Sequence, residues 1–92
     1  MNTATELLST LIQNKCVNTG EENSGNETKN ADTLETFFSN YSSSVQIEKL
    51  HQVENRDNLI VRLEGSDPKA KSLVLLGHTD VVPADGKDWD FD

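Results

Sequence analysis

The chain is short and acidic, with 92 residues, 16 acidic against 8 basic side chains and a formal net charge of −8. This charge, without a cluster of lysine and arginine, argues against nucleic acids and anionic membranes as partners. A chain of this length forms at most one small domain, and its hydrophobic fraction of 34% predicts a thin core.

The cysteine content and the N-terminus give no sign of secretion. A single cysteine, Cys16, cannot form an internal disulfide, and we interpret it as a small buried hydrophobe and not as a nucleophile. The first residues lack a basic segment, and Ser9 and Thr10 interrupt the apolar residues between Leu7 and Ile12. We therefore expect no signal peptide, no transmembrane span and a cytoplasmic location.

Two amphipathic helices are predicted in the first half of the chain. Thr3-Ala4-Thr5-Glu6 reads as a capping box before apolar residues at helical spacing, so the first helix should run to about Lys15. The polar residues 18–30 predict a loop. A second helix is expected over residues 31–41, before Ser42-Ser43-Ser44, because apolar side chains repeat at i, i+3, i+4 and i+7: Leu34, Phe37, Phe38 and Tyr41.

Two half-buried strands in an antiparallel hairpin are predicted next. Residues 45–53 alternate imperfectly between apolar and polar side chains, whereas residues 59–63 alternate cleanly. The polar residues between the two runs favour a turn, and Gly65-Ser66-Asp67-Pro68 predicts another. His51 has no partner at metal-ligand spacing, so we interpret it as an ordinary strand histidine.

Residues 72–83 predict a buried central strand with polar side chains at its tip. Residues 73–76 are four large aliphatics without polar alternation, as in a strand covered on both faces of a parallel sheet. Pro83 has no N–H for a ladder, so the strand should end there. His78 and Asp80 would project to one face at the carboxyl end, where open α/β sheets place their ligands. Taken alone, such a pair is more often a structural hydrogen bond at a strand end.

The residues around this pair extend the motif. Gly77-His78-Thr79-Asp80-Val81-Val82-Pro83-Ala84-Asp85, followed by Trp89, closely resembles the first metal-site motif of a zinc metallopeptidase family. That family contains acetylornithine deacetylase, succinyl-diaminopimelate desuccinylase, aminoacylase and glutamate carboxypeptidase. Upstream, Cys16-Val17-Asn18 and Gly25-Asn26-Glu27 resemble the opening segment of the family, with Cys16 where such proteins often carry serine.

The resemblance implies a fold, a metal centre and a reaction. Residues 1–92 would be the amino-terminal part of a three-layer α/β/α catalytic domain, without the lid or dimerisation domain. His78 would bind one metal of a two-zinc centre, which Co²⁺ can replace, and Asp80 would act in catalysis by orienting the imidazole. The other ligands and the general base would lie beyond Asp92. The full-length protein, which could form a homodimer, would hydrolyse a small peptide or an N-acyl amino acid, and this segment alone would be inactive.

Two other interpretations stay open. A non-catalytic homologue or a truncated product would keep the sheet only for protein association. An unrelated small α/β binding module would have to fold cooperatively from these 92 residues alone. An aspartate ligand and a Glu-Glu pair further along the reading frame would favour the enzyme over both.

Overall fold

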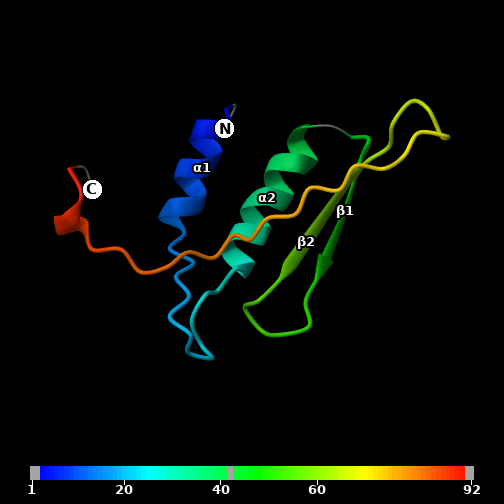
Figure 1. Ribbon diagram of the computed structural model, residues 1–92. Coiled ribbons are helices and arrows are strands. Elements are labelled where there is room, and N and C mark those ends of the chain that lie inside the picture. The colour runs from blue at the N-terminus through cyan, green and yellow to red at the C-terminus, as the bar shows by residue number, and fades with distance from the viewer. Residues whose placement is uncertain (1–2, 42, 91–92) are drawn as a thin grey trace.

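The computed structural model describes residues 3–41 and 43–90, and two helices come first in this chain. Helix α1 spans Ala4–Gln13 and helix α2 spans Thr28–Tyr41, and the two lie next to each other (Figure 1). Ser42, the first of the three serines expected to end the second helix, lies outside the described residues.

The N-terminus of α1 has the cap that its sequence predicts. The backbone N–H of Glu6 donates to Thr3 Oγ1 at 3.1 Å, which satisfies one of the amide groups that a helix start leaves without a partner. The helix ends at Gln13, close to the predicted end at Lys15. Lys15 itself has a φ of 54°, a left-handed conformation that stops the helix.

Helix α2 begins at Thr28 and not at Ala31, so the preceding loop is shorter than predicted. Thr28 and Asn30 have poor helix propensity, and local sequence alone favoured a loop there. Tertiary contacts reverse this preference, because Asn30 is 1% exposed and its side chain forms hydrogen bonds with Asn14 and with the carbonyl of Thr79.

The predicted antiparallel hairpin is confirmed. Strand β1 (Val45–Leu50) pairs with strand β2 (Asn58–Leu63) in a register that runs from Val45 opposite Leu63 to Leu50 opposite Asn58. The first strand ends before the predicted Val53. Asn55 in the connection has a φ of 64°, a conformation that asparagine tolerates better than most residues.

Helix α2 packs against both strands of the hairpin. The aromatic stripe is in part core, since Leu34, Phe37 and Phe38 are half-buried, but Tyr41 is exposed. Lys49 of β1 forms an ion pair with Asp32 of α2, which adds a polar contact at the edge of this layer.

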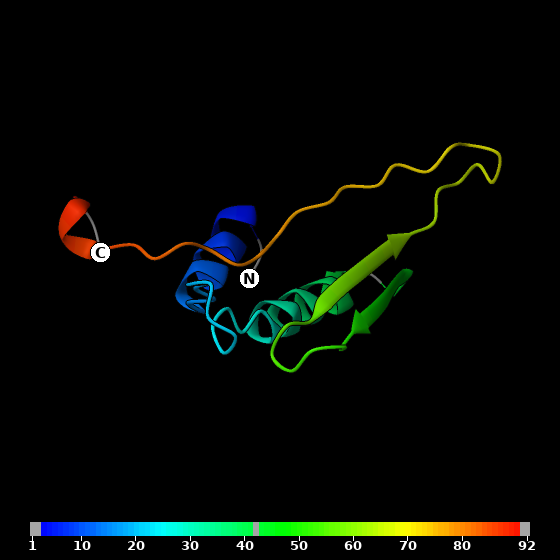
Figure 2. The same ribbon diagram turned by 60° about the horizontal axis from the view of Figure 1, so that its bottom comes forward.

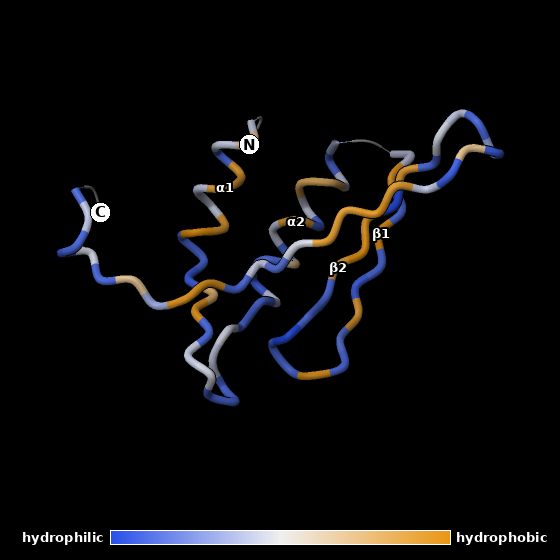
Figure 3. Tube along the Cα trace, viewed as in Figure 1, coloured by the Kyte–Doolittle hydropathy of each residue, from blue (hydrophilic) through white to orange (hydrophobic). Residues whose placement is uncertain are grey.

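The hydrophobic core is small, as the composition predicts. Among the hydrophobic residues that the structure describes, Cys16 and Ala31 are the ones that are fully buried. Figure 3 shows that hydrophobic residues also lie along the extended chain after β2, where they are exposed.

The predicted buried strand is not formed. Residues 71–80 are extended but belong to no strand, and the four side chains of residues 73–76 are 82–97% exposed. Figure 2 shows this segment running apart from the hairpin until it reaches the N-terminal half of the chain. A strand needs hydrogen-bonded neighbours, and the described residues place none beside this segment. The expected three-layer arrangement is accordingly not seen in the described part of the chain.

Candidate functional site

The tip of the extended segment, in contrast to residues 73–76, is held in place. Val17 and Val81 form an isolated parallel bridge. The N–H of Asn18 donates to the carbonyl of Val81 at 2.8 Å, and the N–H of Val81 donates to the carbonyl of Cys16 at 2.9 Å. The segment after α1 therefore fixes the backbone of residues 79–81, of which Thr79 and Asp80 are half-buried.

Two asparagine side chains connect both helices to this tip. Asn30, buried at the start of α2, donates from Nδ2 to the carbonyl of Thr79 at 2.9 Å. Asn14, directly after α1, donates from Nδ2 to Asn30 Oδ1 at 2.9 Å and so fixes the orientation of that amide. The helices thus position a segment that has no sheet around it.

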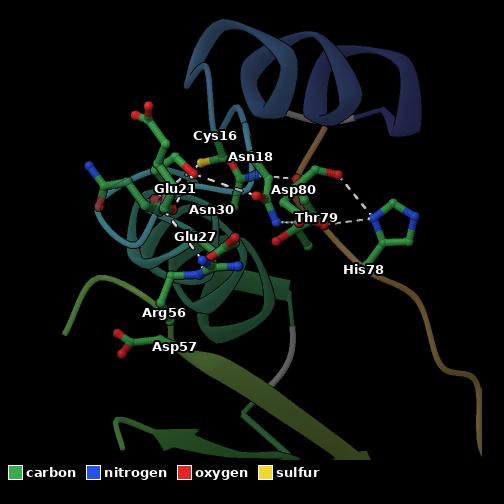
Figure 4. Close-up of polar contacts among 12 residues, drawn as sticks. Cys16, Asn18, Glu21, Glu27, Asn30, Arg56, Asp57, His78, Thr79 and Asp80 are labelled. Atoms are coloured by element: carbon green, nitrogen blue, oxygen red, sulfur yellow. Dashed lines mark hydrogen bonds and ion pairs between the residues drawn. The ribbon is translucent and has the colours of Figure 1, made fainter. Parts of the chain in front are cut away.

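His78 and Asp80, the two residues that the sequence indicates, lie in contact at this tip. His78 Nδ1 is 2.9 Å from Asp80 Oδ1 and also 2.9 Å from the backbone carbonyl of Asp80. The His78 side chain is 86% exposed and that of Asp80 is 24% exposed. Figure 4 shows the other ring nitrogen, Nε2, on the side of the imidazole that faces away from the carboxylate.

The second oxygen of Asp80 also has a partner. Asn18 Nδ2 donates to Asp80 Oδ2 at 2.8 Å. This hydrogen bond is the largest effect on the pKa of Asp80 and lowers it. Burial opposes this shift, and the hydrogen bond from His78 lowers the pKa further. The carboxylate is therefore ionised at neutral pH and can accept hydrogen bonds at both oxygens.

A second cluster of polar side chains lies below the tip in the view of Figure 4. Glu27 and Asp57 are buried; Glu27 forms an ion pair with Arg56, and Asp57 contacts the ring of His51. His51 lies just after β1 and not within a strand as predicted, and its ring contacts the buried carboxylate of Asp57. The pairing of Glu27 with Arg56 joins two regions far apart in the sequence, which periodicity does not show.

A groove of about 790 Å³ separates α2 and the hairpin from the extended segment. Its apolar part is formed on one side by α2 and β2 and on the other by residues 75–76. His78 and Asp80 lie at its polar end, together with the cluster of Glu27, Arg56 and Asp57. The pair is therefore accessible from an open groove.

The described residues can supply one metal ligand, His78, but not a complete metal site. His78 Nε2 points away from Asp80 and is available, whereas residues 3–41 and 43–90 contain no group of three or more histidine, cysteine, aspartate or glutamate side chains placed to hold a metal ion. Cys16 does not contribute, because its buried thiol donates to the carbonyl of Asn26 and burial raises its pKa. None of the helices in the described part of the chain has the length and apolar composition needed to cross a membrane.

Comparison with known proteins finds partial similarity to two hydrolases. The chain is 42% identical to the N-fatty-acyl-amino acid synthase/hydrolase PM20D1 of Bos taurus over 40 residues, which are 44% of this chain and 8% of the relative. It is 35% identical to carboxypeptidase S of Saccharomyces cerevisiae over 63 residues, which are 65% of this chain and 10% of the relative. The chain thus spans about a tenth of the length of these curated relatives. No family model matches the chain, and no solved structure matches it. Both relatives are hydrolases, so the similarity supports a hydrolase family in general terms.

Proposed function

We propose that residues 1–92 form the amino-terminal part of the catalytic domain of a zinc-dependent hydrolase that cleaves a peptide bond or an N-acyl amide bond next to a free carboxylate. The observation that carries this proposal is the His78–Asp80 hydrogen bond at a tip that both helices position. The partial similarity to an N-fatty-acyl-amino acid synthase/hydrolase and to a carboxypeptidase supports the same class of reaction.

In this proposal His78 binds one zinc ion of a two-metal centre through Nε2. Asp80 accepts a hydrogen bond from Nδ1–H, which keeps the proton on Nδ1 and leaves the lone pair on Nε2 for the metal. When bound, zinc acts as a Lewis acid toward the substrate carbonyl and makes a bound water acidic enough to lose a proton near neutral pH. The remaining ligands and the general base come from parts of the protein other than the described residues.

The exposed apolar segment favours a second candidate function. Residues 73–76 are exposed as extended chain and offer unpaired backbone groups, a combination that recruits other strands. A protein that uses residues 1–92 only for association would need this segment but not the His78–Asp80 pair. The two candidates therefore differ in what happens when His78 is removed.

The decisive experiment replaces His78 in the complete gene product. Since zinc would lose a ligand, His78→Ala should reduce the bound zinc by one ion per chain and remove turnover of a panel of N-acyl amino acids and dipeptides. Metal content is measured by elemental analysis beside turnover. His51→Ala is the matched control, because His51 also contacts a carboxylate but lies outside the tip. If His78→Ala kept its full zinc content and near-parental turnover, the proposed metal site would be wrong.

A further inference from the structure

Asn18 contacts the candidate metal-site pair although it lies far from it in the sequence. Its Nδ2 donates to Asp80 Oδ2 at 2.8 Å, while His78 Nδ1 contacts the other oxygen, Oδ1, at 2.9 Å (Figure 4). Each carboxylate oxygen thus has its own side-chain partner. Rotation about the bond to a carboxylate group is soft, so a second partner on the carboxylate restricts the direction in which the first oxygen points.

The orientation of the Asn18 amide follows from its other contacts. Asn18 Oδ1 accepts from the backbone N–H of Gly20 at 2.8 Å, and a backbone N–H can only donate. The oxygen of the amide must therefore face Gly20, which leaves the NH₂ group facing Asp80. The carboxylate of Asp80, as an ionised acceptor, matches that group.

The backbone explains why these two side chains meet. Asn18 and Asp80 each lie one residue from the bridged pair Val17 and Val81. Side chains alternate between the faces of an extended chain, so Asn18 and Asp80 emerge on the same face of the two parallel segments. The bridge itself is fixed by the hydrogen bonds from the amides of Asn18 and Val81, which makes this placement a property of the fold.

We infer that Asn18 is a positioning residue of the candidate metal site: its amide holds Asp80 Oδ2, so that Oδ1 accepts the hydrogen bond from His78 Nδ1–H and Nε2 faces outward. This inference rests on the proposed function, because it assigns to Asn18 a part in preparing His78 for the metal. A carboxylate that supports a metal-bound histidine matters at about 10–100-fold in metal affinity or activity, and Asn18 acts on the metal site through that carboxylate.

Two substitutions of Asn18 in the complete gene product test the inference. Asn18→Asp keeps the size and the oxygen that accepts from Gly20, but it cannot donate to Asp80 and adds a like charge beside it. Asn18→Ala removes the donor without adding charge. Asn23→Asp is the matched control, since it adds the same charge to an exposed position in the same loop.

The measurements are chosen to report on His78 before any metal is present. In the metal-free protein, ¹⁵N-resolved spectra of the neutral imidazole show which nitrogen carries the proton. We expect the Nδ1–H form to dominate in the parent and in Asn23→Asp, and to fall in both Asn18 variants. Zinc titration of the same proteins should show affinity at the His78 site weakened by up to about 10-fold in both Asn18 variants, because Asn18 acts on His78 only through Asp80. Turnover should fall mainly in kcat.

The outcomes separate the inference from the proposed function. If both Asn18 variants keep the parental tautomer and the parental zinc affinity, while His78→Ala loses its zinc, Asn18 has no positioning role and the proposed function stands. If His78→Ala keeps all its zinc, the proposed function fails and the inference fails with it. A change in both Asn18 variants but not in Asn23→Asp supports the inference.

Discussion

The Asp80 carboxylate accepts two hydrogen bonds, one at each oxygen. The side-chain amide of an asparagine could not accept both of them. Asn18 and His78 each donate to a different oxygen of Asp80. An asparagine at this position has one oxygen, so it can accept from only one of the two donors and would present its own NH₂ group to the other. The charge that keeps the proton on His78 Nδ1 would also be lost.

We therefore expect Asp80→Asn in the complete gene product to separate metal binding from turnover. His78 is still present, so most of the zinc should remain, while turnover should fall by about 10–100-fold. Elemental analysis and kcat are measured on the same preparation, with Asp90→Asn as a control for the loss of one exposed carboxylate. Loss of zinc to the same extent as in His78→Ala would instead indicate that Asp80 binds the metal directly.

At the scale of elements, the turn before α2 depends on a glycine whose Cβ position is already occupied. Gly25 has a φ of 91°, and a Cβ built on it would lie 2.5 Å from Glu27 Oε1 and 3.0 Å from Arg56 Cζ. The Glu27 carboxylate, which is buried, cannot move aside without breaking its ion pair with Arg56. Gly20 has nearly the same φ, 88°, but nothing lies within 4 Å of its Cβ position.

We therefore predict that substitution by alanine lowers the free energy of unfolding by different amounts at Gly20 and at Gly25. Gly20→Ala should lower the free energy of unfolding by about 1–2 kcal/mol, the cost of a left-handed backbone for an L-residue. Gly25→Ala should cost about 1–3 kcal/mol more, because the added methyl group overlaps the ion pair. Urea unfolding of both variants measures the difference. Equal costs at the two positions would show that the Glu27–Arg56 pair does not constrain this turn.

The elements that the sequence predicted well are those whose signals are local. The capping box at Thr3, the helical repeat of apolar residues and the alternation in residues 59–63 need only neighbouring residues, and the structure has the corresponding helices and hairpin. The start of α2 at Thr28 was missed because the burial of Asn30 against distant segments decides it.

The predicted strand failed for a related physical reason. Residues 73–76 have the composition of a buried strand, but burial requires partner strands, and the described residues supply none beside them. The contact of His78 with Asp80 was predictable from their spacing, whereas Asn18 and Asn30 were not identified as site residues because they reach the tip only through the fold. The resemblance to the opening segment of the family was the one signal that drew attention to Asn18.

At the scale of the whole molecule, the chain is more extended than a domain of its length. Its radius of gyration is 15.5 Å, against about 12 Å for a compact 92-residue domain. The segment after β2 contributes to this difference, because its backbone runs apart from the hairpin (Figure 2). Its aliphatic residues 73–76 are exposed. Exposed apolar chain with unpaired backbone groups favours pairing with another strand.

We predict that the 92-residue chain self-associates through this segment. Leu76→Lys should shift the chain toward the monomer, because Leu76 is 97% exposed and a charge there opposes strand pairing without disturbing the core. Val53→Lys, at an exposed position in the hairpin connection, is the control. Sedimentation velocity over a range of concentrations measures the effect. A parental chain that stays monomeric, with the amides of residues 73–76 strongly protected from hydrogen exchange, would contradict the prediction.

The same chain is expected to bind zinc only weakly and to have no hydrolase activity. Zinc sites in proteins use three or four protein ligands, and the described residues provide one imidazole in position, His78, with no group of three candidate ligands. Calorimetric titration should accordingly show no tight, stoichiometric binding, and His78→Ala should change the titration little.

Self-association could create a zinc site that a single copy lacks, because two copies could place two His78 side chains near one ion. The titration is therefore repeated with Leu76→Lys, in which association is reduced. A tight site that survives in this variant would show that residues 1–92 hold zinc on their own, contrary to the assignment of the other ligands to the rest of the protein.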